Sequence, residues 1–109
     1  MMNAEQLSTW LSAIASPQRM RILSQIVSEP LHVSELARRV EMSRPLLYMH
    51  LTKLEEAGFV AGHHELTPDG RALKLFQAIP FSSTLDLATL QAAVAETDAH
   101  NTTHPDESE

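Results

Sequence analysis

Apolar side chains recur at the spacing of one helical face in three sets near the start of the chain. The sets are Leu7, Trp10, Leu11 and Ile14; Ile22, Leu23, Ile26 and Val27; and Val33, Leu36, Ala37 and Val40. Each set predicts a short amphipathic helix, because residues at this spacing fall on one side of a helix. We expect Ser16 with Pro17 to begin the second helix, which stops near Pro30, and Ser34 to begin the third.

A fourth helix is predicted over residues 43–57, with Ser43 as its N-cap and Pro45 in its first turn. Gly58 is expected to follow its end in the left-handed conformation. Only residues 41–43 separate this helix from the third, and such a pair is typical of a helix-turn-helix. The side chains expected to face the core are Leu47, Leu51 and Leu54.

The period then changes to that of short strands. Residues 59–66 and 72–79 predict two strands, and the sequence Thr-Pro-Asp-Gly at 67–70 is a strong turn signal between them. A last helix is predicted from Leu87, Leu90 and Val94 with Ala88, Ala92 and Ala95. The expected fold is therefore mainly α with a small β-hairpin: a winged helix-turn-helix of about five helices and a two-stranded wing.

The fourth helix is narrow enough to enter the major groove of DNA. Its outward face combines a guanidinium suited to guanine, apolar side chains suited to thymine methyl groups, and a lysine suited to phosphate. The candidate DNA-binding residues are Ser43, Arg44, Pro45, Leu46, Tyr48, Met49, Thr52 and Lys53, with Arg71 in the wing.

Composition narrows the function classes. A chain of 109 residues that is 43% hydrophobic suits one globular domain, and the absence of cysteine excludes disulfides, thiolate metal sites and cysteine nucleophiles. No apolar run approaches the roughly 20 residues of a membrane span, and residues 1–10 lack the pattern of a secretory signal, so we expect a cytoplasmic protein without a membrane partner. Neither a glycine-rich phosphate loop nor a nucleophile elbow occurs, so we expect neither an enzyme nor a cofactor.

The net charge of −6 is unevenly distributed along the chain. Residues 96–109 contribute −5 and contain few large apolar side chains, so we expect a domain over 1–95 and a disordered acidic tail over 96–109. Residues 17–53 carry six basic and three acidic side chains, which concentrates positive charge on the predicted recognition unit.

Three stretches of the sequence resemble one family of regulators. SPQRMRILSQI, VSELARRVEMSRPLLYMHLTKLEEAGFV and ELTPDGRALKLF are similar to winged helix-turn-helix regulators of the arsenical-resistance-repressor (ArsR) type. The resemblance implies a homodimeric transcription repressor whose terminal helices form the dimer and whose wing touches the flanking backbone or minor groove. It places Arg44, Pro45, Tyr48 and Met49 at base-reading positions. Tyr48 and Met49 depart from the small polar residue and arginine common there, which implies a more apolar operator preference.

The family also often has glycine at the position of Glu41. If this residue keeps a positive φ, the substitution costs about 1 kcal/mol. The candidate residues for a dimer, which can equally belong to the core of one subunit, are Leu7, Trp10, Leu11, Leu87, Leu90 and Val94. A two-fold dimer would recognise an inverted-repeat operator.

Many members of the family sense metal ions, so the histidines matter. Asp98 and His100, with His104 four residues on, imitate part of a family site on the last helix, but nothing further matches and we expect no metal site. His50 is expected to be a packed, hydrogen-bonded helix residue. At least one of His63 and His64 in the wing lies where phosphate could approach, but the sequence favours plain exposed histidines there.

Several alternatives stay open on the sequence alone. Arg19 and Arg21 suit phosphate contacts, but Arg19 equally suits a bracing ion pair with an acidic side chain. Lys74 flanks the wing turn with Arg71, close to acidic Glu65 and Asp69. The alternative function is a winged-helix module that docks on another protein through the apolar side chains of the fourth helix. The operator, the effector and the direction of regulation are not encoded in any motif.

Overall fold

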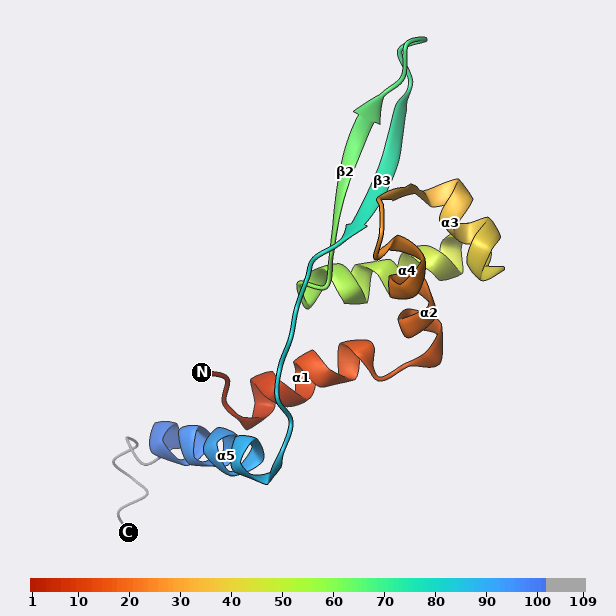
Figure 1. Cartoon of the computed structure of the whole chain (residues 1–109). Helices are drawn as coiled ribbons and strands as arrows, with labels where there is room; N and C mark the ends of the chain where they lie inside the picture. Colours follow the sequence, from red (N-terminus) through yellow and green to blue (C-terminus); the bar gives the residue numbers. More distant parts are fainter. Residues whose placement is uncertain (102–109) are drawn as a thin grey trace. The chain divides into compact units, whose positions relative to one another are not determined.

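The computed structural model describes residues 1–101, with side chains up to residue 99, and these residues form two compact units. One unit comprises residues 13–81, and the other comprises residues 1–12 with the last part of the chain from Ser82 onward. The described residues contain five helices and three strands, and Figure 1 shows their order along the chain. No helix in this part of the chain is long and apolar enough to cross a membrane.

The unit of residues 13–81 is built around three helices, α2 (Pro17–Ile26), α3 (Val33–Val40) and α4 (Arg44–Glu56). Their inward faces match the predicted apolar spacing. Complete or nearly complete burial, with exposed fractions of 0–1%, is reached by Ile22, Leu36, Leu47, Leu51 and Leu54. Each such side chain contributes about 1.5–3 kcal/mol by leaving water, so these helices hold one another in place.

The predicted starts of α2 and α4 are confirmed. The hydroxyl oxygens of Ser16 and Ser43 each accept a hydrogen bond of 3.3 Å from the backbone three residues ahead. The start predicted for α3 at Ser34 is wrong: Val33 is already helical and His32 occupies the N-cap position without a side-chain cap. The chain enters α3 directly from a two-residue strand, β1 (Leu31–His32), so Ser34 lies inside the first turn.

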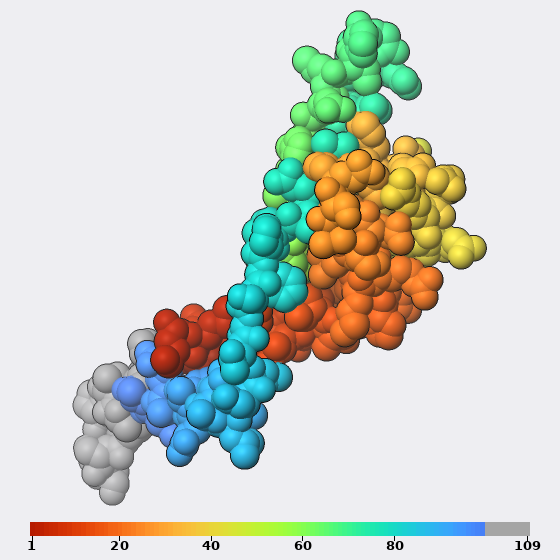
Figure 2. All heavy atoms as spheres, viewed as in Figure 1, coloured from red at the N-terminus to blue at the C-terminus, as the bar shows by residue number. Residues whose placement is uncertain are grey.

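The two predicted wing strands are confirmed as β2 (Val60–Leu66) and β3 (Ala72–Ala78). The sheet nevertheless has three antiparallel strands in the order β1-β3-β2, so the expectation of two strands was incomplete. Leu31 pairs with Phe76 in this sheet, and both side chains are buried. A two-residue strand is too short to show an alternating pattern, which is why β1 is not visible in the sequence. Figure 2 shows the outer part of the hairpin standing clear of the helices of its unit.

The inner end of the hairpin is fixed by one ring packed on a glycine. Gly62 pairs with Phe76, and a Cβ atom at Gly62 would lie 2.7 Å from Cε1 of that ring. The Phe76 ring also meets Tyr48 of α4 edge to face, with centroids 6.4 Å apart. The absence of a side chain at Gly62 therefore lets the wing pack closely on the ring that contacts α4.

The second unit contains α1 (Ala4–Ile14), whose last two residues group with the first unit, and α5 (Leu87–Asn101). The amide of Ala4 donates to Oγ1 of Thr97 at 2.8 Å, and Asp86 caps α5 by accepting from the amide of Thr89 at 2.8 Å. Leu7 and Ala93 are buried, with exposed fractions of 8% and 3%.

The domain boundary expected between residues 95 and 96 falls inside α5, which continues to Asn101. Thr97 explains the difference, because its hydroxyl accepts from α1 and donates to the carbonyl of Ala93 at 3.1 Å. The acidic neighbours Glu96 and Asp98 stay exposed. Residues 102–109 of the expected tail lie outside the described residues.

The turn between α3 and α4 contains a strained residue. Glu41 has φ 55° and ψ 48°, the left-handed conformation, and the amide of Met42 donates to Ala37 at 3.1 Å. The same pattern of hydrogen bonds ends α4, where Gly58 occupies the corresponding position with φ 85°. The left-handed conformation is unfavourable for a residue with a Cβ atom, so Glu41 pays a penalty that Gly58 avoids.

We expect Glu41→Gly to raise the free energy of unfolding by about 1 kcal/mol, because glycine tolerates the left-handed conformation. Urea denaturation of the full chain measures the change. Glu41→Ala is the matched control, since it removes the carboxylate and keeps the Cβ atom, and it should give no comparable gain. Equal stability of the glycine variant and the natural chain would contradict the assignment of strain to this residue.

Candidate nucleic-acid interface

The outward face of α4 is open to solvent in this structure. The exposed fractions are 40% for Leu46, 40% for Tyr48 and 56% for Met49. The other predicted DNA-binding side chains of this helix are also exposed, namely Arg44, Pro45, Thr52 and Lys53. Ser43 is exposed as well, but its hydroxyl oxygen accepts from the amide of Leu46 and so caps the helix.

The basic side chains of α4 form no ion pairs within the described part of the chain, whereas those of α3 share one carboxylate. Neither Arg44 nor Lys53 has an ion-pair partner among residues 1–99. On α3, Arg38 and Arg39 both donate to the Glu35 carboxylate, from Nε atoms at 3.0 Å and 2.7 Å. These hydrogen bonds lower the pKa of Glu35 to about 2, so its carboxylate stays ionised and offsets one of the two arginine charges. Arg44 and Lys53 of α4 are therefore free of ion pairs with these residues, although Glu55 and Glu56 at the end of the same helix are acidic.

Arg19 braces α4 from behind. Its Nε atom donates to Nδ1 of His50 at 3.1 Å, and its Nη1 atom donates to the carbonyl of Ala13 at 3.2 Å. The bracing role is thus favoured over a phosphate contact, but the expected acidic partner was wrong, since a histidine takes its place. Burial, and then the charge of Arg19, lower the pKa of His50. His50 is accordingly the hydrogen-bonded helix residue that its spacing predicts, and its neutral ring accepts the bond.

A cleft of about 310 Å³ lies between the start of α4 and the wing. Arg44 and Tyr48 line it from α4, and the paired residues His64 and Lys74 line it from the hairpin. The Nζ atom of Lys74 lies 5.5 Å from the centroid of the Phe76 ring. The remaining lining residues are His32, Val33, Ser34, Ala72 and Leu73.

Sequence reasoning did not bring His64 and Lys74 together with Arg44. The signal was present in the turn, because closure at residues 67–71 pairs Leu66 with Ala72 and therefore His64 with Lys74. Opposite residues of an antiparallel pair share a face of the sheet. The contact between α4 and this face of the sheet is tertiary, and no local sequence pattern predicts it.

The tip of the wing carries a compensated charge. Arg71, a predicted DNA contact, lies with its Nε atom 3.2 Å from Oδ2 of Asp69. A hydrogen bond from the Thr67 hydroxyl is the main cause of the lowered pKa of Asp69, which keeps this partner ionised. Glu65 contacts His32 at 3.1 Å nearby. The wing tip therefore offers little net positive charge.

The candidate dimer residues separate into two groups. Leu7 is buried within its own chain, and Trp10 and Leu11 are half-buried. Leu87, Leu90 and Val94 on α5 are exposed, with fractions of 83%, 43% and 51%. Burial thus assigns Leu7 to the core of one subunit and leaves an apolar stripe on α5 without cover from the described residues.

No group of three metal-ligating side chains occurs among the residues that the structure describes. The partial motif at Asp98, His100 and His104 is not tested by this finding. The His104 residue and the side chain of His100 lie outside the described part of the chain.

The helix pair, the following hairpin and the exposed outer face of α4 define the chain as a winged helix-turn-helix protein of the DNA-binding class. A family model described as bacterial regulatory protein, arsR family, matches residues 16–61. An uncharacterized HTH-type transcriptional regulator of Methanocaldococcus jannaschii is 37% identical over 75 residues, which cover 68% of this chain and 77% of that protein. The chain belongs to the arsR family of DNA-binding transcriptional regulators.

Solved structures agree with this assignment. NolR from Sinorhizobium fredii is 28% identical with a TM-score of 0.61, over 86% of this chain and 85% of that one. A homodimeric winged helix-turn-helix DNA-binding domain from Mycobacterium bovis has a TM-score of 0.60 and 22% identity, over 93% of this chain and 86% of that one. At this identity the second likeness shows the shared fold alone.

The lowered pKa of His50 predicts a pH dependence of stability. An unfolded histidine takes up a proton near its ordinary pKa of 6.5, before the folded one does. The contribution of His50 is therefore complete above that pH and is lost as the pH falls toward the lower folded value. We expect the free energy of unfolding to fall between pH 7.5 and 5 by less in His50→Gln, whose amide oxygen still accepts from Arg19. Urea denaturation at both pH values tests this, and identical pH profiles would contradict it.

Proposed function

We propose that the protein is a repressor that binds an inverted-repeat operator as a homodimer, with α4 of each subunit in the major groove. The observation that carries the proposal is the exposed outer face of α4, which joins apolar side chains to Arg44 and Lys53, two cations outside any ion pair of the described residues. Its inner face is buried, so entry into a groove requires no rearrangement of the helix.

The residues of α4 divide the work of recognition. Arg44, in the first turn, suits bidentate donation to guanine, and Leu46 and Met49 suit thymine methyl groups. Lys53, in the last turn of the same helix, suits a backbone phosphate, and such a contact carries no sequence information. The Tyr48 ring contacts the Phe76 ring edge to face, so a contact within the protein orients Tyr48 before DNA binds.

The proposed dimer uses the apolar stripe on α5, formed by Leu87, Leu90 and Val94. An exposed apolar row on a helix is the usual mark of an interface. Support also comes from the Mycobacterium bovis neighbour, which is described as homodimeric. Two recognition helices related by a two-fold axis would contact half-sites about 34 Å apart.

One observation favours a second function. Leu46, Tyr48 and Met49 form an exposed apolar surface, and such a surface also suits docking on another protein. Salt separates the two functions, because DNA binding releases counterions and weakens steeply as salt rises. Apolar docking would change little with salt.

The DNA interface is tested by selecting bound duplexes from a random pool at two salt concentrations, followed by binding assays on the selected sequence. Arg44→Ala should weaken specific binding by about 1–3 kcal/mol and relax preference at one base position. Lys53→Ala should weaken all duplexes alike and reduce the salt dependence by about one counterion. Unchanged affinity and footprint in both variants would remove α4 from the groove.

The proposed dimer interface is tested by sedimentation of a charged variant. Leu90→Glu places a carboxylate in the apolar stripe and should convert the dimer into a monomer, since an unpaired charge resists burial. Ala95→Glu adds the same charge to an exposed position on another side of α5, and it should remain dimeric. A Leu90→Glu protein with the mass of the natural dimer would exclude this stripe as the interface.

A further inference from the structure

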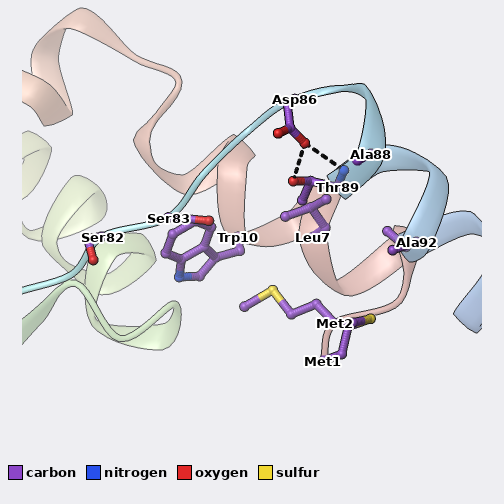
Figure 3. Close-up of a pocket in the computed structure, with 11 residues that line it drawn as sticks. Met1, Met2, Leu7, Trp10, Ser82, Ser83, Asp86, Ala88, Thr89 and Ala92 are labelled. Atoms are coloured by element: carbon purple, nitrogen blue, oxygen red, sulfur yellow. Dashed lines mark hydrogen bonds between the residues drawn. The ribbon is translucent and has the colours of Figure 1, made fainter.

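The unit that contains α1 and α5 has a cavity of about 540 Å³. This volume falls in the range of natural sites for small molecules, roughly 300–1,000 Å³. Figure 3 shows Trp10 and Leu7 of α1, the Met2 side chain and the first turns of α5 around it. The lining residues are Met1, Met2, Leu7, Trp10, Ser82, Ser83, Asp86, Ala88, Thr89, Ala92 and Ala93.

The cavity exists because α5 presents small side chains to it. Ala88, Ala92 and Ala93 lie along this side of the helix and leave the space between α5 and Trp10 unfilled. Ala92 is two residues from Leu90, which places them about 200° apart around the helix. The cavity and the apolar stripe proposed for dimerisation therefore lie on different sides of α5, and occupation of one leaves the other accessible.

The walls are apolar with a polar group at one edge. The indole of Trp10 and the side chain of Met2 provide polarisable apolar surface, and hydroxyl groups of Ser82 and Ser83 lie nearby (Figure 3). The Asp86 carboxylate accepts from the amide and the hydroxyl of Thr89, at 2.8 Å and 2.7 Å through Oδ1. These hydrogen bonds lower the pKa of Asp86, so the cavity has an ionised carboxylate at its edge.

The charged side chains of this unit favour a cationic ligand over an anionic one. Residues 1–12 and 82–109 contain seven acidic side chains and neither lysine nor arginine. An anion entering the cavity would meet the Asp86 carboxylate without a lysine or arginine from these segments to offset it, and the terminal amine of Met1 is the cationic group that the lining itself contains. A cation would be attracted by this carboxylate and by the face of the Trp10 ring, since tryptophan is the best aromatic partner for a cation.

We propose that this cavity binds a small organic cation, with a compact apolar body against Trp10 and Met2 and an ammonium group directed toward Asp86. The family assignment does not contain this site, and its lining residues belong to a different unit from α4. The ligand class is defined by three features together: a partly open apolar volume, an indole face and an excess of acidic over lysine and arginine side chains.

A matched series of probes tests the proposal on the full chain. The compounds 1-adamantanamine, 1-adamantanol and 1-adamantanecarboxylate share one apolar body and differ in charge. Trp10 is the only tryptophan, so its fluorescence reports directly on the cavity. We expect saturable binding of the amine with a dissociation constant of about 1 mM or lower, and binding of the alcohol and the carboxylate weaker by about ten-fold or more.

Two variants locate the site and one serves as a control. Ala92→Leu fills the cavity and should abolish the fluorescence change, whereas Ala95→Leu adds the same side chain to an exposed position of α5 outside the lining and should bind normally. Asp86→Asn keeps a capping oxygen for α5 and should equalise the amine and the alcohol. Circular dichroism confirms that each variant folds.

The proposal is overturned if the amine gives no saturable change, if the carboxylate binds as tightly as the amine, or if folded Ala92→Leu binds like the natural chain. Each result is obtained without DNA, so it leaves the proposed operator binding unaffected.

Discussion

Burial of one side of α4 is the interaction on which the rest of the structure depends. Leu47, Leu51 and Leu54 are shielded from water almost completely, and together they contribute several kcal/mol to folding. Because these three residues point inward, Tyr48, Met49 and Thr52 between them point outward, while His50 lies at the edge of the buried side. The exposed recognition face is thus a direct geometric result of the core, and Arg19 with His50 adds a polar brace from α2.

The helices of the first unit could be predicted from the sequence because local and tertiary requirements agree there. Ser16 and Ser43 are strong N-caps, and the apolar spacing behind each of them is regular. The start of α3 was predicted wrongly because Ser34, a residue type that favours N-caps, lies inside the first turn of this helix. The pairing of Leu31 with Phe76 draws the chain into a strand up to His32, so this long-range contact overrides the local preference.

The candidate site was predictable in part for a similar reason. Exposure of Arg44, Tyr48 and Met49 follows from helical geometry alone. The partners of Arg19 and Arg71 did not follow, since hydrogen bonds between distant elements leave no periodic signal. The end of α5 shows the same limit: the sequence after residue 95 is polar, but Thr97 connects α1 and α5 by hydrogen bonds that composition does not reveal.

All eight lysine and arginine side chains fall within residues 13–81, while half of the fourteen acidic side chains fall in the rest of the chain. A polyanion in solution is therefore attracted to the unit that contains α4 and repelled by the unit that contains α5, before any contact forms. Such an uneven field turns a diffusing molecule during its encounter, which favours productive collisions over random ones. The rate of association should consequently depend more on this asymmetry than the overall negative charge suggests. Salt at about 0.1 M would screen the attraction beyond a distance of about 10 Å.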